Sequence, residues 1–372
     1  MAKILINYTG RTAGGAAHAY MMTKSLIEAG ADVYVIISRQ ADNYKAWKAL
    51  PAKKILAIDT YTNKREFVFR TLQLILYRRF LFVREFKGIN FTAIYVPMGT
   101  YWSYVISNLF PKVPVYYTIH DPKLHSGESL FNRFFHKITC YEISKAHKII
   151  TLSQCFVKEI MEIYKKAEED VIVIPQSAFW EYKLSHSKRD IVNYDSNKVN
   201  FLFFGRIEDY KGLDLLLIAY EKLEREFPNN VSLTIAGKGS LAKYAESIKR
   251  IKNKNVLNYM IPDEQIASLF GGKKIVTVLP YKDATQSGVI NTAFMFNSLV
   301  IASNVGAIPY QLNHGDLGVL LDKNDVTSLY NAMHDVVAHY EEYKVYIERA
   351  KSYIDELKWD NLALKLLNQI EE

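Results

Sequence analysis

The sequence is poor in cysteine and has no long apolar run. Cys140 and Cys155 are the two cysteines among 372 residues, which argues against a disulfide framework or a cysteine-based zinc site. No apolar stretch reaches the roughly 18 residues that a membrane-spanning helix requires, and residues 1–7 lack the apolar core of a signal peptide. We therefore expect a protein of the reducing cytoplasm, soluble or bound peripherally to the inner face of the membrane.

Several catalytic signatures are also missing. The chain has no G-x-G-x-x-G segment after its first strand, which weighs against an NAD enzyme. Ser287 lies in Gln286-Ser287-Gly288 and not in G-x-S-x-G, so a hydrolase nucleophile is not supported. No spacing of His, Asp and Glu resembles a metal site. We therefore expect neither a cofactor nor a metal ion.

Positive charge exceeds negative charge along the chain. Lys and Arg number 47 against 39 Asp and Glu, which gives a formal net charge of +8. This balance fits an anionic ligand, an anionic membrane surface or a nucleic acid, and does not choose among them. With 49% hydrophobic and 23% charged residues the composition is typical of folded proteins. A chain of 372 residues is too long for one ordinary core and indicates two domains.

Short apolar segments alternate with helical patterns, first over residues 1–177 and again over residues 199–354. The expected strands lie at residues 3–7, 32–37, 93–96, 114–119, 148–152, 171–174, 199–204, 231–236, 256–259, 275–279 and 299–303. This alternation predicts an α/β fold of two doubly wound, Rossmann-like domains with parallel sheets, facing a cleft. A polar linker at 178–198 joins the domains, and an amphipathic helix within 355–372 ends the chain.

Ligands of open α/β sheets bind beyond the carboxyl ends of the strands. Four polar or glycine-rich segments are expected there: residues 10–15, 118–121, 205–211 and 283–289. In the third segment, Gly205, Arg206, Lys211 and Gly212 stand between an apolar strand and a helix. Glycines admit a close ligand, a helix N-terminus offers free N–H groups, and the cations can hold phosphate oxygens. This segment predicts a diphosphate site; a structural turn with two solvated cations is the alternative.

Three further features near the strand ends each allow two interpretations. The glycine pair at residues 14–15 either lines a ligand or simply opens a helix. His120 is either a proton or hydrogen-bond site or a structural histidine, and the neighbouring Asp121 and His125 favour a polar pocket wall. The glycine-flanked lysine of residues 237–239 either lines a nucleotide pocket or only turns the chain.

Residues 64–87 combine cations with apolar side chains. The cations are Lys64, Arg65, Arg70, Arg78, Arg79, Arg84 and Lys87, with apolar and aromatic residues between them. A basic amphipathic helix of this kind can lie on an anionic bilayer. The alternative is a surface helix whose apolar stripe packs on its own sheet.

An ordered set of segments runs through the chain. Its members are Gly14-Gly15, His120-Asp121, Gly205-Arg206 with Lys211-Gly212, residues 236–239, and Gly288 followed by residues 305–309. Together they resemble the retaining glycosyltransferases of the GT-B fold, the group 1 family that is also called family 4. Residues 357–360 and the helix after them look like the family's closing helix, which crosses back to the N-terminal domain.

The resemblance implies roles for the matching positions. Arg206 and Lys211 match the cations that hold the donor diphosphate, and His120 matches the histidine near the transferred sugar. The N-terminal domain would then lie on the acceptor side, and the C-terminal domain would bind the nucleotide-sugar. The implied donor-binding residues are Gly14, Gly15, Gly205, Gly237, Lys238, Met260, Ile261, Thr285, Gln286, Ser287, Gly288 and Val289, with Asp121 and His125 toward the acceptor.

The sequence departs from the family at one point. The family commonly carries two glutamates in the pattern E-x7-E, and aligning its central glycine on Gly288 places Thr285 and Ala293 at those positions. Residues 284–289 look similar to a segment found in a branch of the family. The sugar hydroxyls would then meet the polar side chains of residues 285–287 and the backbone N–H groups that follow.

The resemblance implies a metal-independent hexosyltransferase. It would move a sugar from a nucleotide-diphospho-sugar to a glycan or lipid-linked acceptor in cell-surface polysaccharide synthesis. A non-catalytic partner subunit of a glycosyltransferase complex and a GT-B sugar-nucleotide epimerase are the alternatives. We expect no nucleic-acid partner, because the densest basic cluster lies in one apolar helical segment and not in a stripe.

Overall fold

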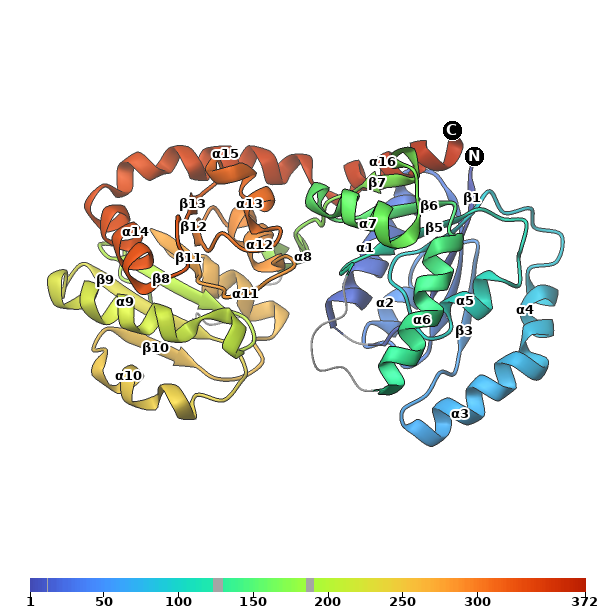
Figure 1. The fold of residues 1–372 in the computed structure, drawn as a ribbon, viewed down its shortest axis with the longest axis horizontal. Helices are drawn as coiled ribbons and strands as arrows, with labels where there is room; N and C mark the ends of the chain where they lie inside the picture. The colour runs from blue at the N-terminus through green and yellow to red at the C-terminus, as the bar shows by residue number, and fades with distance from the viewer. Residues whose placement is uncertain (12, 123–129, 185–190) are drawn as a thin grey trace. The chain divides into compact units, whose positions relative to one another are not determined.

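The computed structural model describes residues 1–11, 13–122, 130–184 and 191–372. The chain divides into two compact units (Figure 1): unit 1 comprises Met1–Pro175 and Trp359–Glu372, and unit 2 comprises Gln176–Lys358. Each unit contains one parallel β-sheet with helices on both faces. The predicted α/β fold of two doubly wound domains is therefore confirmed.

The sheet of unit 1 has the strand order β3-β2-β1-β4-β5-β6-β7, and its described pairs are parallel. Its strands are β1 (Lys3–Tyr8), β2 (Asp32–Ser38), β3 (Lys54–Ile58), β4 (Ala93–Val96), β5 (Val115–Ile119), β6 (Lys148–Thr151) and β7 (Val171–Val173). The central strands β1 and β4 are mostly apolar, and all of their residues except Lys3 are buried. A continuous apolar run is what a parallel strand covered by helices on both sides requires.

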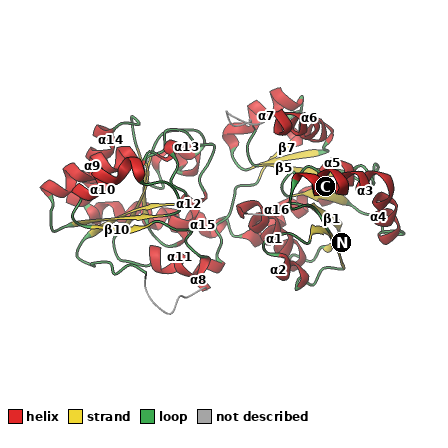
Figure 2. Ribbon diagram, turned by 90° about the horizontal axis from the view of Figure 1, so that it is seen from below, coloured by secondary structure: helices red, strands yellow, loops and turns green. Residues whose placement is uncertain are grey.

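Helices cover both faces of this sheet (Figure 2). They are α1 (Ala13–Glu28), α2 (Tyr44–Lys48), α3 (Lys64–Gln73), α4 (Arg79–Glu85), α5 (Ser103–Ser107), α6 (Leu130–Lys145), α7 (Val157–Tyr164) and α16 (Trp359–Glu371). Helices α1 and α16 lie on one face, and α5, α6 and α7 lie on the other. The chain end is fixed to unit 1, because Ser25 Oγ donates to Asp360 at 2.7 Å and Tyr116 donates to the Gln369 carbonyl at 2.7 Å.

Residues 64–87 form α3, a π-helical turn at Leu74–Arg78, and α4. Asn63 caps α3 by accepting a hydrogen bond from the Glu66 N–H at 3.0 Å, as an N-cap side chain does. One apolar stripe packs on the sheet through Phe67, Leu74, Phe82 and Phe86. The other apolar side chains of this segment are exposed, so packing on the sheet accounts for only part of its apolar character.

The sheet of unit 2 has the order β10-β9-β8-β11-β12-β13 and is parallel as well. Its strands are β8 (Val199–Phe204), β9 (Val231–Ala236), β10 (Lys254–Leu257), β11 (Ile275–Leu279), β12 (Leu299–Ala302) and β13 (Val319–Leu320). Its helices are α8 (Glu181–Leu184), α9 (Leu213–Glu226), α10 (Ala245–Arg250), α11 (Asp263–Phe270), α12 (Gly288–Met295), α13 (Ile308–Gln311), α14 (Val326–Ala338) and α15 (Lys344–Glu356). Helices α9 and α14 cover one face, and α11, α12 and α15 cover the other (Figure 2).

Two strands were not expected from the sequence, and one is displaced. One of them, β3, lies at the edge of the sheet and is only partly buried. Its apolar run is short, and for this reason the sequence pattern did not predict it. The strand β13 has two residues, and β10 begins two residues before the predicted position 256. Part of the predicted linker packs in the core of unit 2 through Ala178 and Val192; the domain boundaries given above stay a prediction.

Candidate functional site

The turn after β8 lies at the carboxyl edge of the unit 2 sheet. Gly205 follows the strand with a φ of +119°, and a short 3₁₀ turn at Asp209–Lys211 leads to Gly212, which has a φ of +66° and precedes α9. A Cβ at Gly212 would lie 1.8 Å from the Pro280 carbonyl oxygen, so a larger residue would push α9 away from the end of β11. Glycine at position 212 therefore fixes the start of α9 against the sheet edge.

Lys211 is the most unusual cation of this turn. Its side chain is 9% exposed, and its Nζ lies 5.1 Å from the centroid of the Tyr281 ring. Within the described residues its ammonium group forms neither an ion pair nor a hydrogen bond. Burial lowers the pKa of Lys211 and the positive charge of Arg206 lowers it further, while Tyr210 and Glu208 oppose this shift. A buried cation without a counter-charge is costly, and it marks a place where an anion is favoured.

Arg206 differs from Lys211 in exposure. Its side chain is 68% exposed, and its Nη1 lies 3.6 Å from Glu208 Oε1. A pair this exposed holds the guanidinium only weakly. Arg206 therefore keeps the freedom to turn toward a ligand, whereas Lys211 is already in place.

The turn after β9 packs directly on the turn after β8. A Cβ at Gly237, whose φ is +149°, would lie 1.8 Å from the Gly205 carbonyl oxygen, and the Ile207 N–H donates to the Lys238 carbonyl at 3.0 Å. Gly239 pairs with Ile207 in an isolated bridge. The glycines of residues 237–239 thus permit backbone contact between two turns, and Lys238 is exposed.

The loop between β11 and α12 is held from behind by α13. Gln311 accepts from the Ser287 N–H at 2.8 Å and donates to the Ser287 carbonyl at 3.1 Å. The Thr285 carbonyl accepts from the Ala307 N–H at 3.0 Å. Ser287 is buried, Thr285, Gln286 and Val289 are half-buried, and Gly288 is exposed. This loop is therefore rigid at its base and open at the first turn of α12.

Met260 and Ile261, which the sequence predicts beside the nucleotide, differ in exposure from one another, and Ala293, at the position of a family glutamate, is buried. Met260 is 64% exposed after β10, while Ile261 is 7% exposed and belongs to the core. Ala293 is fully buried in the apolar core through α12. A carboxylate at position 293 would therefore have to enter that core, which explains why this chain accommodates alanine there.

The carboxyl edge of the unit 1 sheet brings two histidines together. His120 follows β5, and its Nε2 lies 3.0 Å from the Pro97 carbonyl oxygen. Because a carbonyl oxygen only accepts, the hydrogen of His120 is on Nε2, and Nδ1 is left as an acceptor in the neutral ring. Burial lowers the pKa of His120, and the Pro97 bond and Asp121 partly oppose this, so the ring is neutral near pH 7.

His18 of α1 was not singled out from the sequence. It is 2% exposed, and its ring centroid lies 4.8 Å from that of His120 and 5.2 Å from that of Trp359. Neither of its ring nitrogens has a hydrogen-bond partner in the part of the chain that the structure describes. The spacing of Gly15 and His18 in one helix is the signal that could have found it. A Cβ at Gly15 would lie 2.0 Å from Met98 Sδ, whereas Gly14 faces open space. His125 lies outside the described residues.

The predicted site residues thus form one group in each unit. In unit 2 the backbone bond from the Lys282 N–H to the Tyr210 carbonyl, 2.6 Å, joins the turn after β8 to the loop after β11. In the described part of the chain, no cluster of three or more His, Cys, Asp and Glu side chains is arranged to hold a metal ion. Among the residues that the structure describes, neither Cys140 nor Cys155 takes part in a disulfide bond.

Two family models match this chain, one in each half. The model described as "Glycosyltransferase Family 4" matches residues 12–177, and the model described as "Glycosyl transferases group 1" matches residues 186–353. An uncharacterized glycosyltransferase of Methanocaldococcus jannaschii is 23% identical over 273 residues, which cover 69% of each protein.

Solved structures share the fold. The crystal structure of Anabaena HepE in complex with UDP and glucose matches with a TM-score of 0.70 and 15% identity over 100% of both chains. The structure of WaaG, a glycosyltransferase involved in lipopolysaccharide biosynthesis, matches with a TM-score of 0.65 and 13% identity over 99% of both chains. With sheets, turns and both family models in agreement, the chain belongs to the GT-B-fold glycosyltransferases of group 1, family 4.

Proposed function

We propose that this chain transfers a hexosyl group from a nucleotide-diphospho-sugar to a glycan or lipid-linked acceptor, with retention of the anomeric configuration and without a metal ion. The product would serve cell-surface polysaccharide synthesis. The observation that carries the proposal is the buried ammonium group of Lys211 at the carboxyl edge of the unit 2 sheet, which has no ion-pair partner among the described residues. The complex of Anabaena HepE with UDP and glucose supports UDP as the first nucleotide to test.

The hard step of such a transfer is the departure of a nucleoside diphosphate, on which negative charge develops. A fixed cation in a water-poor site stabilises that charge without the reorganisation that water would need. Lys211 is held in this way by Tyr281 and Gly205. The free N–H groups at the start of α9, which spans 14 residues, add a positive dipole end. Arg206 would add a fork of donors once it turns from solvent.

The remaining steps need orientation more than a strong base. The departing phosphate can take the proton of the acceptor hydroxyl, which attacks from the same face and so retains the configuration. Nδ1 of His120 would accept a hydrogen bond from a sugar hydroxyl, and residues 285–289 would meet the other hydroxyls of the donor. Holding the reactants in this geometry supplies a large part of the rate enhancement.

The proposal is tested by replacing Lys211 with methionine, which keeps the length of the side chain and removes its charge. The wild-type protein should be stabilised thermally by one of the UDP, GDP, ADP or dTDP sugars, because a ligand that binds only the folded state raises its stability. The variant should lose most of this shift and at least 100-fold of turnover, in line with about 3 kcal/mol for one charge-stabilising group.

Lys222→Met is the matched control, since Lys222 is an exposed lysine farther along the same helix α9. It should bind and turn over the donor like the wild type. A Lys211→Met protein with the wild-type nucleotide shift would overturn the proposal. Nucleotide binding without transfer or hydrolysis of any sugar would favour a non-catalytic partner subunit instead.

We also propose that residues 64–87 place the enzyme on an anionic bilayer. Nine large apolar side chains of this segment are exposed, from 38% for Leu81 to 67% for Leu76. Cations lie among them, and an apolar stripe flanked by cations suits an interface with anionic lipids. No helix in the described part of the chain has both the length and the apolar character to cross a membrane. The role of WaaG in lipopolysaccharide biosynthesis supports a lipid-linked acceptor.

Vesicle sedimentation tests this attachment. Arg79→Glu with Arg84→Glu should abolish binding to vesicles that contain 30% phosphatidylglycerol, because each cation near such a surface contributes about 1 kcal/mol. Lys222→Glu with Lys249→Glu, in unit 2, changes the net charge equally and should leave binding intact. Equal loss in both double variants would show general charge attraction and would contradict a specific docking segment.

A further inference from the structure

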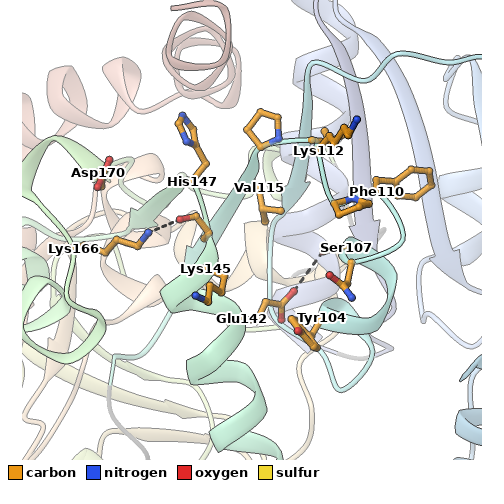
Figure 3. A pocket seen from close by; sticks show the side chains of 15 residues that line it. Tyr104, Ser107, Phe110, Lys112, Val115, Glu142, Lys145, His147, Lys166 and Asp170 are labelled. Atoms are coloured by element: carbon orange, nitrogen blue, oxygen red, sulfur yellow. Dashed lines mark hydrogen bonds between the residues drawn. The ribbon is translucent and has the colours of Figure 1, made fainter.

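Unit 1 contains a cavity of about 610 Å³ at the amino ends of β5 and β6 (Figure 3). Its walls come from α5, the loop before β5, the last turn of α6, the turn before β6, and the segment that leads to β7. His120 follows the opposite, carboxyl end of β5, and the five residues of that strand separate the two by roughly 15 Å. The cavity is therefore distinct from the carboxyl edge described above.

The floor of the cavity holds a buried carboxyl group. Glu142 of α6 is 4% exposed, and its one hydrogen bond within the described residues is a long one, 3.5 Å, from Ser107 Oγ. Figure 3 shows these two side chains pointing toward one another from α6 and α5. Burial raises the pKa of Glu142 to about 8, and the Ser107 bond opposes this. A carboxyl group with free donor and acceptor capacity thus faces the cavity.

The polar character extends behind Glu142 into the sheet. Ser107 Oγ also accepts from Asn7 Nδ2 at 2.9 Å, while Asn7 Oδ1 and the Tyr117 hydroxyl have no hydrogen-bond partner among the described residues. Buried polar groups are normally satisfied, so a partly satisfied network calls for an explanation. A ligand that brings hydroxyl groups to Glu142 and Ser107 would complete the part of the network that lines the cavity.

The walls carry unpaired positive charge. Lys112, Lys145 and Lys166 line the cavity, and none of them forms an ion pair with a described carboxylate. Lys166 Nζ donates to the Ala146 carbonyl at 2.5 Å. Asp170 also lines the cavity, but its carboxylate lies 3.3 Å from Lys148 Nζ. Figure 3 shows Lys145 and Lys166 on one side of the cavity and Lys112 on the other, so Lys145 and Lys166 are the two cations that can meet one phosphate group.

We propose that this cavity is a second ligand site, which binds a phosphorylated sugar through Glu142, Ser107, Lys145 and Lys166. The phosphate lies toward Lys145 and Lys166, and the sugar hydroxyls bond to Glu142 and Ser107. Tyr104 and Phe110 line the same cavity and add apolar surface to its wall. The volume lies within the range of small-molecule sites, about 300–1,000 Å³. The inference does not depend on the transferase reaction.

Titration calorimetry with glucose 6-phosphate, glucose and inorganic phosphate tests the site. Glucose 6-phosphate should bind at least tenfold more tightly than either part alone, since both halves of the cavity contribute. A phosphorylated sugar at the end of a lipid-linked glycan has the same chemistry as free glucose 6-phosphate. Octyl glucoside 6-phosphate, which carries an alkyl chain, distinguishes these two sources of the ligand. If the octyl compound binds as tightly as glucose 6-phosphate, the cavity accepts the end of a larger molecule; if only the free sugar binds, the ligand is a metabolite. Both results support the site.

Variants locate the binding. Glu142→Gln keeps the size of the side chain and a hydrogen-bond donor. It should lower the affinity for glucose 6-phosphate about tenfold. Lys145→Glu changes an exposed residue that lines the cavity and should abolish binding. Lys165→Glu is the matched control, because Lys165 is exposed, adjoins Lys166 and does not line the cavity.

Lys211→Met separates this site from the proposed donor site and should leave glucose 6-phosphate binding unchanged. Binding that is lost in Lys211→Met and kept in Lys145→Glu would overturn the inference. Equal affinity for inorganic phosphate and glucose 6-phosphate would overturn it as well, since the sugar would then contribute nothing.

Discussion

The buried carboxyl group of Glu142 should make the stability of unit 1 depend on pH. Its pKa is about 8 in the folded protein, against an ordinary value of 4.5. Below pH 4.5 the group is protonated in both states and contributes no pH dependence. Between pH 4.5 and 8 the unfolded chain ionises while the folded chain keeps the proton, so stability falls as pH rises. Above pH 8 both states are ionised and the loss is complete.

Glu142→Gln removes this titration. One pKa unit corresponds to about 1.4 kcal/mol, so the full shift would lower the free energy of unfolding by about 5 kcal/mol. This value is an upper limit, because an ionised side chain can turn toward water in the cavity. Between pH 5 and pH 9 the free energy of unfolding of the variant should rise by up to about 4 kcal/mol relative to that of the wild type. For a unit of this size the gain corresponds to roughly 10 °C in Tm.

Tryptophan fluorescence can follow unit 1 alone. Trp47, Trp102 and Trp359 are buried in unit 1, and Trp180 belongs to unit 2. In a Trp180→Phe background, thermal unfolding of both proteins is measured at half-unit steps from pH 5 to 9. The difference between the two Tm values should grow with pH and level off above pH 8. A constant difference over the whole range would refute the reasoning, because it would mean that Glu142 titrates normally.

Three other substitutions test the packing of unit 2. Gly237→Ala should destabilise unit 2 by about 3 kcal/mol in chemical denaturation, because its φ is +149° and the Cβ would meet the Gly205 carbonyl at 1.8 Å. Ala293→Glu should destabilise it by at least about 3 kcal/mol, since the carboxylate would enter an apolar core, whereas Thr285→Glu should fold normally. Glu224→Ala should cost about 2 kcal/mol in the same assay, because the backbone N–H groups of residues 252 and 253 both donate to this carboxylate. Wild-type stability in any of these three variants would contradict the packing that predicts its loss.

The strands and the cationic turn were predictable because their signals are local. An apolar run at residues 201–204 ends at a glycine, and the helix that follows begins at Leu213. The sequence also placed Lys211 in this turn. It could not show that the ammonium group is buried, because Tyr281 lies 70 residues later in the chain and reaches Lys211 only after the sheet has formed.

Glu142 and His18 illustrate the same limit in unit 1. In the sequence Glu142 looks like any other glutamate on a helix. It becomes buried only because α6 packs against α5 and the sheet, where Ser107 and Asn7 come from positions 35 and more residues away. His18 likewise meets Trp359 from the other end of the chain. Residue type and spacing predict which groups a turn contains, whereas burial depends on partners that only the tertiary fold supplies.

Lys211 is a basic side chain and Glu142 an acidic one, but both are buried with too few interaction partners. Each is buried, and each has fewer partners than its charge or hydrogen-bonding capacity requires. Removing either group relieves an unfavourable burial, so a variant can gain stability while it loses its ligand. A purely structural residue behaves differently, because its removal lowers stability and has no specific effect on binding. Measuring stability and affinity in the same variants therefore separates a binding role from a structural one at both positions.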